Sequence, residues 1–149
     1  MNDASYMQIA LKEAEKAKAN SEVPVGAIIV HNRKIIGKGY NQTITLSDPT
    51  AHAEITAIKQ ASNFLANHRI VDSEIYVTLE PCSMCYGAII QSRISRIIFG
   101  AYDSNTGVCG SCLKLQDEDC FNHRPNIIGG VLGANCSKIL KDFFKAKRT

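Results

Sequence analysis

Residues 75–99 read IYVTLEPCSMCYGAIIQSRISRIIF and show the pattern that organises the whole chain. The run from Ile75 to Leu79 is short, apolar and rich in β-strand formers, as expected of a buried strand. Ser83 to Ser92 then predicts a helix, and Ile94 to Phe99 predicts a second buried strand that Gly100 ends. Buried strands that alternate with helices in this way are typical of an α/β protein.

The same periodicities continue on either side of this stretch. They predict helices over residues 5–19, 51–65 and 136–147, strands over 25–30, 34–40 and 127–132, and one helical turn near 113–116. Only a short turn separates the first two strands, so they form an antiparallel hairpin. Gly37 and Gly39 either weaken its second strand or let another segment approach that backbone closely. Together these elements predict one domain over residues 1–149, a three-layer α/β/α sandwich around a mixed five-stranded sheet.

The composition is that of a chain with a hydrophobic core. Of the 149 residues, 45% are hydrophobic and 21% are charged, which excludes a disordered tail. No run approaches the roughly 20 apolar residues of a membrane helix, and residues 1–5 lack the pattern of a secretory signal. We therefore expect a cytoplasmic protein with no membrane partner. Its net charge of +3 is too small to indicate nucleic-acid binding by itself.

Two short motifs carry the candidate chemistry, and each begins a predicted helix. They are His52-Ala53-Glu54 and Pro81-Cys82-Ser83-Met84-Cys85. One imidazole and two thiolates are ligands that zinc prefers, and a site with three protein ligands leaves a fourth position for water, as in catalytic zinc sites. Zinc lowers the pKa of such a water to about 7. Glu54, in the same helical turn as His52, is placed to take up and return the proton of that water.

Two other interpretations of these motifs are weaker. A structural zinc site needs a fourth protein ligand and leaves Glu54 without a task. A redox Cys-x-x-Cys pair is not normally accompanied by an upstream His-x-Glu motif. The sequence therefore favours a catalytic zinc ion held by His52, Cys82 and Cys85.

The combination of His-x-Glu with Pro-Cys-x-x-Cys resembles the signature of the cytidine-deaminase-like zinc deaminases. Within that superfamily, the surrounding segments resemble bacterial tRNA adenosine deaminases over about residues 6–148. The matching segments are 22–27, 48–55, 76–82, 92–94, 99–103, 106–107, 122–124 and 142–145. The zinc motif is common to the superfamily, whereas Asn122-His123-Arg124 and the Phe143-Phe144 pair are more specific to the tRNA enzymes.

The resemblance implies a cytidine-deaminase-like fold and hydrolytic conversion of adenosine to inosine at the wobble position, the first anticodon position, of a tRNA. It further implies a homodimer with one zinc ion per subunit and a tRNA anticodon stem-loop as partner. Glu54 would be the proton shuttle beside the three zinc ligands. The implied substrate-binding residues are Asn41, Asp103, Asn122, His123 and Arg124. Among these, Asn41 matches the family asparagine that hydrogen-bonds the flipped base, and Asp103 matches a loop carboxylate near the anticodon ribose.

Several other residues have two interpretations. Cys109 and Cys112 form a second Cys-x-x-Cys pair, but Cys120 and Cys136 are distant in sequence, so we favour inert thiols over a second metal site. His123 and Arg124 contact either RNA phosphate or only neighbouring protein groups. Five cations at the end of the chain form either a solvated helix face or a phosphate-binding patch, and they are Lys138, Lys141, Lys145, Lys147 and Arg148.

Two glutamates near the motifs suggest supporting roles. Glu80 directly precedes the Pro81-Cys82 motif, and its side chain is suited to holding a loop through backbone amides. Glu22 precedes Val23-Pro24 and is a candidate to anchor the wall of the active site.

Two alternative functions remain from the sequence. One is a deaminase of a free base or nucleotide, such as guanine or cytosine, on the same scaffold. The other is a catalytically silent RNA-binding or zinc-binding protein. The presence of Glu54 argues against the silent protein, because only a catalyst needs a proton shuttle. The basic C-terminal helix weakly favours an RNA substrate over a free base.

Overall fold

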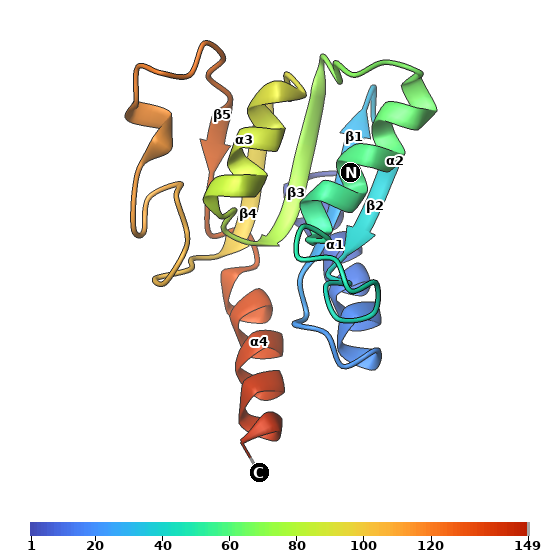
Figure 1. The fold of residues 1–149 in the computed structure, drawn as a ribbon, viewed down its shortest axis with the longest axis vertical. Coiled ribbons are helices and arrows are strands. Elements are labelled where there is room, and N and C mark those ends of the chain that lie inside the picture. The colour runs from blue at the N-terminus through green and yellow to red at the C-terminus, as the bar shows by residue number, and fades with distance from the viewer. Residues whose placement is uncertain (149) are drawn as a thin grey trace.

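The computed structural model describes residues 1–148 and arranges them as a five-stranded sheet between two pairs of helices (Figure 1). The strands are β1 (Gly26–His31), β2 (Lys34–Tyr40), β3 (Ser73–Leu79), β4 (Arg96–Ala101) and β5 (Asn126–Ile128). The helices are α1 (Asp3–Ala19), α2 (Ala53–Leu65), α3 (Ser83–Gln91) and α4 (Gly133–Lys147), with a short 3-10 helix, η1, at Leu115–Asp117. This architecture confirms the predicted three-layer α/β/α sandwich with a mixed central sheet.

The sheet has the strand order β2-β1-β3-β4-β5. β1 pairs antiparallel with both β2 and β3, whereas β3, β4 and β5 are mutually parallel. The register places Ile28, Tyr76, Ile98 and Ile128 in one row across four strands. Because β3 and β4 are parallel, their carboxyl ends lie at the same edge of the sheet, where loops carrying functional residues meet.

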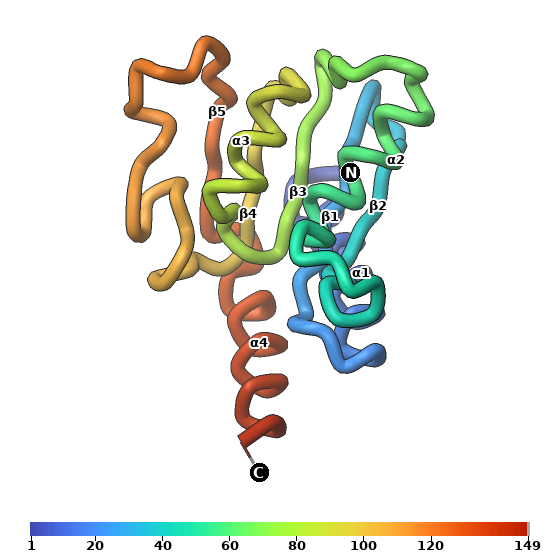
Figure 2. The backbone as a smooth tube through the Cα atoms, viewed as in Figure 1, coloured from blue at the N-terminus to red at the C-terminus, as the bar shows by residue number. Residues whose placement is uncertain are grey.

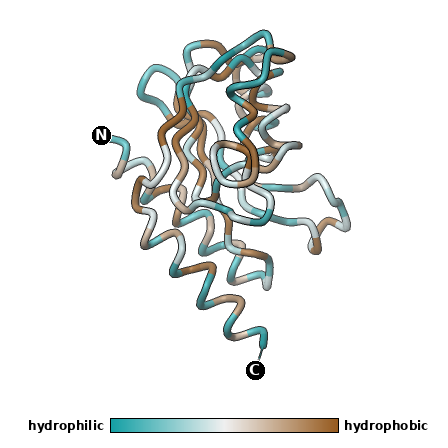
Figure 3. Tube along the Cα trace, turned by 90° about the vertical axis from the view of Figure 1, so that its left-hand side faces the viewer, coloured by the Kyte–Doolittle hydropathy of each residue, from teal (hydrophilic) through white to brown (hydrophobic). Residues whose placement is uncertain are grey.

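Alternate strand residues point to opposite faces, so the sheet has two separate hydrophobic cores. Ile29, Ile75 and Ile97 pack against α2 and α3, while Ile28 and Tyr76 pack against α1 and α4. Figure 3 shows hydrophobic colours gathered along the strands and mixed colours along α4, which covers only one side of the sheet. None of the helices within residues 1–148 has the length and apolar character needed to cross a lipid bilayer.

Two glycines of β2 let α2 pack directly on the strand backbone. A Cβ atom at Gly37 would lie 2.4 Å from the carbonyl oxygen of Ala57, and one at Gly39 would lie 2.3 Å from that of Ala53. This confirms the close approach that was one of the two interpretations of these glycines. The contact matters for function because it fixes the first turn of α2, next to His52.

The structure corrects three predicted boundaries. Gly100 does not end β4, which continues to Ala101, and Ala101 pairs with Leu79 of β3. The lack of a side chain at Gly100 instead makes room for Cys136. A Cβ atom at Gly100 would lie 2.3 Å from the Cys136 Sγ atom. β5 ends at Ile128 rather than at residue 132, and α4 begins at Gly133 rather than at residue 136. The other predicted elements lie within two residues of those observed.

Residues 102–125 connect β4 to β5 and contain only η1 as a regular helix or strand. This segment runs beside α3, as the orange part of the tube in Figure 2 shows. The rings of Tyr86 and Phe121 pack edge to face with their centroids 5.3 Å apart, which holds the segment against α3.

Candidate active site

The two predicted zinc-binding motifs meet at the starts of two helices. His52 is the N-cap residue of α2, Cys82 is the N-cap residue of α3, and Cys85 lies one turn further along α3. The Nδ1 atom of His52 lies 3.7 Å from the Sγ atom of Cys82 and 3.5 Å from that of Cys85. All three candidate ligand atoms lie within 4.8 Å of one another. Cys82 lies thirty positions after His52 in the sequence, so only the fold brings the two motifs together.

These three side chains suit one zinc ion by their chemistry. Neither His52 nor Cys82 uses its side chain to cap its own helix, so the nitrogen and sulfur atoms remain available. The hydrogen bond with the Cys85 thiol and the one with His52 lower the pKa of the Cys82 thiol to about 4, although burial opposes this shift. A thiolate is the form that binds a metal. Within residues 1–148 no other three His, Cys, Asp or Glu side chains converge in this way.

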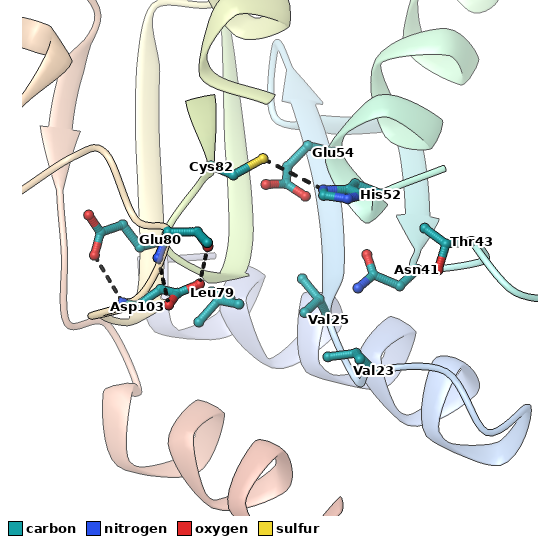
Figure 4. A pocket seen from close by; sticks show the side chains of 11 residues that line it. Val23, Val25, Asn41, Thr43, His52, Glu54, Leu79, Glu80, Cys82 and Asp103 are labelled. Carbon is teal, nitrogen blue, oxygen red and sulfur yellow. Dashed lines mark hydrogen bonds between the residues drawn. The ribbon is translucent and has the colours of Figure 1, made fainter. Parts of the chain in front are cut away.

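Glu54 lies in the first turn of α2 and is almost completely buried. Figure 4 shows its carboxyl group between the side chains of Cys82 and His52. Burial raises the pKa of Glu54 to about 7. A carboxyl group with a pKa near the pH of the cell both accepts and donates a proton readily, which is what general acid–base catalysis requires.

A cavity of about 210 Å³ opens in front of these residues (Figure 4). Besides His52, Glu54 and Cys82, it is lined by Val23, Val25, Asn41, Thr43, Leu79, Glu80, Asp103 and Thr106. The Oδ1 atom of Asn41 accepts a hydrogen bond from the backbone N–H of Ala53 at 2.9 Å. This contact occupies the acceptor atom of the Asn41 amide, so its NH₂ group remains to donate to a ligand.

The surroundings of Asp103 hold it at the rim of this cavity. Its Oδ1 atom accepts hydrogen bonds from the backbone N–H groups of Asn105 and Thr106, and its Oδ2 atom accepts one from the Thr106 hydroxyl at 2.8 Å. The structure thus places Asn41 and Asp103 at the same cavity as His52 and Cys82, and substrate binding by Asn41 and Asp103 remains a prediction.

Comparison with known proteins gives one consistent family. Residues 1–101 match the model of the cytidine and deoxycytidylate deaminase zinc-binding region. The chain is 48% identical over 147 residues to a tRNA-specific adenosine deaminase of Haemophilus influenzae, covering 98% of this chain and 85% of that protein. It is 41% identical over 146 residues to the one of Bacillus subtilis, covering 98% and 91%. This chain belongs to the family of tRNA-specific adenosine deaminases.

Solved structures agree with this assignment. One from studies of A-to-I editing by tRNA deaminases at the wobble position of transfer RNA superposes with a TM-score of 0.89 at 38% identity, covering 91% of this chain and 99% of that chain. A guanine deaminase from Nitrosomonas europaea superposes with a TM-score of 0.74 at 21% identity, which shows the shared fold alone. The deaminase described here is therefore a zinc-dependent enzyme with a cytidine-deaminase-like fold, and its His, Cys and Cys side chains suit one zinc ion per chain.

Three of the predicted substrate-binding residues of the deaminase do not line the cavity. The Nε2 atom of His123 lies 2.7 Å from the carbonyl oxygen of Ile94, and the Oδ1 atom of Asn122 accepts a hydrogen bond from Arg93 at 3.4 Å. Arg124 donates to backbone carbonyl groups within its own loop. These contacts fasten the segment 102–125 near the end of α3. An RNA contact by Asn122, His123 or Arg124 remains a prediction.

The other four cysteines of the deaminase are free and scattered. Cys109 and Cys136 are buried, whereas Cys112 and Cys120 are exposed. Burial raises the pKa of Cys109 to about 12 and that of Cys136 to about 11, so both remain protonated at neutral pH. Cys112 donates a hydrogen bond from its thiol to the carbonyl oxygen of Ser104 at 2.9 Å. The interpretation of these residues as inert thiols accounts for this arrangement.

Sequence reasoning did not identify a second cavity of about 390 Å³ beside the first. It lies between residues 101–106 and α4, and it shares Val23, Leu79, Asp103 and Thr106 with the first cavity. Lys141 and Phe144 of α4 contribute to its wall. The sequence signal for this cavity was that segments 99–103 and 142–145 both resemble the tRNA enzymes. The two segments come together only because α4 packs on β4.

Proposed function

We propose that this deaminase converts adenosine to inosine at the wobble position of a tRNA. The observation that carries the proposal is the cavity where Glu54 and the Asn41 amide face the same space as the zinc-ligand candidates. The relatives, which are named tRNA-specific adenosine deaminases, support tRNA as the substrate. We further propose that residues 1–149 act as one catalytic domain in a cytoplasmic homodimer, a state that light scattering during size-exclusion chromatography tests.

In this proposal His52, Cys82 and Cys85 hold one zinc ion, which when bound supplies a water molecule of lowered pKa. Glu54 takes one proton from the attacking water and delivers it to N1 of adenine. It then takes the remaining proton of the hydroxyl group added at C6 and delivers it to the amino group, which leaves as ammonia while the C6 carbonyl forms. Water and adenosine thus give inosine and ammonia. Its pKa of about 7 suits Glu54 to both directions of proton transfer, and its burial keeps bulk water from competing.

The remaining lining residues orient the base and its ribose. The Asn41 NH₂ group donates to an acceptor on the edge of the purine, while Val25 and Leu79 contact its apolar faces. Asp103 has lone pairs left to accept a hydrogen bond from the ribose 2′-hydroxyl, which distinguishes RNA from DNA. An anticodon loop is already single-stranded, so turning its base into the cavity costs little stacking energy.

The basic residues of α4 are candidates for phosphate contacts. Lys141 lines the second cavity, next to the first, whereas Lys138 forms an ion pair with Asp142 at 2.7 Å. Replacing Lys141, Lys145 and Lys147 with alanine should weaken RNA binding and reduce its salt dependence, by a slope of about 0.7 for each phosphate that is no longer neutralised. An unchanged salt slope would assign these lysines to a solvated surface.

The decisive experiment compares two substrates. The zinc-loaded protein is incubated separately with an anticodon stem-loop that carries adenosine at the wobble position and with free guanine, and the products are separated by chromatography. We expect inosine from the RNA and no xanthine from guanine. Xanthine without inosine would instead identify a free-base deaminase, and neither product would favour a catalytically silent protein.

A further inference from the structure

Two buried glutamates near the cavity take no part in the proposed proton transfer. Glu22, which precedes β1, is 1% exposed, and Glu80, which follows β3, is 2% exposed. Neither forms an ion pair with any side chain within residues 1–148. A buried carboxylate without a cationic partner is costly unless hydrogen bonds stabilise it, so the donors around each one identify its task.

Glu22 holds the loop between β2 and α2. One of its oxygens accepts hydrogen bonds from the backbone N–H of Ile44 at 3.2 Å and the hydroxyl of Thr43 at 3.5 Å. The other accepts from the backbone N–H of Thr45 at 2.7 Å and from its hydroxyl at 2.6 Å. Although burial raises the pKa of Glu22, the bonds from these three residues outweigh it and keep that pKa below its usual value. The same loop carries Asn41 and Thr43, which line the cavity.

Glu80 does the same for the segment after β4. One oxygen accepts hydrogen bonds from the backbone N–H of Asp103 at 3.0 Å and from the Ser111 hydroxyl. The other accepts from the backbone N–H groups of Cys109 at 2.8 Å and Ser111 at 3.1 Å. This confirms the loop-holding role that the sequence suggested for Glu80. The segment carries Asp103 and Thr106, which line the cavity, and Figure 4 shows Asp103 across the cavity from Asn41 and Thr43.

Every hydrogen-bond partner of the two carboxylates is a donor, so each position requires a side chain that only accepts hydrogen bonds. A glutamine at either position has nearly the same shape, but its NH₂ group would face backbone N–H groups that cannot turn away. At Glu80 there is also no free space, because a Cβ atom on Gly107 would lie 2.4 Å from the carboxyl carbon. Loss of either carboxylate should therefore release one wall of the cavity while the zinc-ligand helices stay fixed on the sheet.

We propose that Glu22 and Glu80 are a pair of positioning residues that set the shape of the substrate cavity from its two sides. Each holds one substrate-facing loop. Glu22 does not line the cavity, and both oxygens of Glu80, which does line it, accept hydrogen bonds from the segment that Glu80 holds. This inference rests on the proposed function, because it assigns the effect to binding of the RNA substrate. Interactions that hold the substrate equally in the ground state and the transition state change KM and leave kcat unchanged.

The test uses Glu22→Gln and Glu80→Gln in the zinc-loaded protein, with the anticodon stem-loop as substrate. We expect each to raise KM roughly tenfold, a factor that corresponds to about 1.4 kcal/mol, and to change kcat less than about twofold. Glu13→Gln is the matched control, because Glu13 is also a buried glutamate, 4% exposed, but lies on α1 and pairs with Lys16. The control should leave KM unchanged even if it lowers the melting temperature.

A milder variant and a direct structural readout guard against simple misfolding. Thr45→Val removes one hydroxyl donor and leaves the backbone amide, so it should raise KM in the same direction but less. Amide hydrogen exchange followed by NMR should become faster at Ile44 and Thr45 in Glu22→Gln, and at Cys109 and Ser111 in Glu80→Gln, each without effect on the other loop.

The outcomes separate this inference from the proposed function. Faster exchange with a raised KM supports the positioning role. An active parent protein whose variants show unchanged KM, or a lowered kcat alone, overturns it. If the parent protein forms no inosine from the stem-loop, the proposed function is wrong, and the amide exchange rates alone decide whether the two carboxylates hold their loops.

Discussion

The chain contains two Cys-x-x-Cys pairs, one at the start of a helix and the other in a turn. Cys82 and Cys85 begin α3, where both sulfur atoms point toward His52. Cys109 and Cys112 instead lie in a turn of the 102–125 segment, which Gly110 completes with a φ of +148°. There the first thiol is buried and the second is exposed. Identical spacing therefore gives two sulfur atoms that meet one histidine in the first pair, and one buried and one exposed thiol in the second.

The difference shows that a helix start and a third ligand make the site, not the spacing. A helix N-terminus favours the thiolate form, and the turn at residues 109–112 has no such helix. His52 reaches the first pair only because α2 packs on the backbone of β2 and begins beside α3. No histidine within residues 1–148 forms a comparable group with the second pair.

Replacing one cysteine of each pair should have the largest effect on zinc binding and activity, and the effect should differ most between the two pairs. Cys85→Ser should abolish both zinc binding and inosine formation, because two protein ligands do not hold a zinc ion stably. Cys112→Ser is the matched control in the second pair and should keep both. Metal analysis of the dialysed proteins and chromatography of the reaction products provide the measurements. Zinc loss in the Cys112→Ser variant would mean that the second pair also binds metal.

A change at Glu54 separates proton transfer from metal binding at the site that contains Cys82 and Cys85. Glu54→Gln should keep zinc and the affinity for the stem-loop but lower turnover by about 10²- to 10⁴-fold, the usual contribution of a general acid–base group. Fluorescence anisotropy with labelled stem-loop and single-turnover kinetics measure the two quantities. Normal turnover in a zinc-loaded variant would contradict the role of Glu54 as proton shuttle.

The same comparison explains which parts of the site the sequence could predict. His52, Glu54 and the first cysteine pair were recognisable because their motifs sit where helix patterns begin, so local periodicity placed each motif at a helix start, whereas their meeting depends on the fold. The path of residues 102–125 was not predictable, because Glu80 and the ring of Tyr86 hold it from distant positions in the sequence. The second cavity was missed for a similar reason, since α4 forms its wall.

A substitution at Gly39 tests whether the close packing of α2 on β2 positions His52, the third candidate zinc ligand. A methyl group there would meet the backbone of α2, so Gly39→Ala should lower the free energy of unfolding by about 1–3 kcal/mol, as overpacking does. Gly87 on α3 is the matched control, because a Cβ atom there has no neighbour within 4 Å. Gly87→Ala should leave stability unchanged or raise it by about 0.5–1 kcal/mol.

Urea denaturation of the zinc-loaded proteins measures these changes. If displacement of α2 matters for the metal, the Gly39→Ala variant should also release zinc to a competing chelator faster than the Gly87→Ala variant does. Equal stability of the two variants would show that α2 adjusts its position freely, and the packing argument for His52 would fail.

The smallest expected effect concerns the reactivity of the second cysteine pair. In the zinc-loaded protein at about pH 7.5, iodoacetamide should label Cys112 and Cys120, which are exposed. It should spare Cys109 and Cys136, because pKa values of about 12 and 11 leave fewer than about one thiol in a thousand ionised. Peptide mass spectrometry locates the labels, and the labelled protein should still form inosine at the original rate. Labelling of Cys109 ahead of Cys112 would mean that the turn at residues 109–112 opens in solution. The two cysteine pairs would then differ in mobility rather than in the geometry of their sulfur atoms.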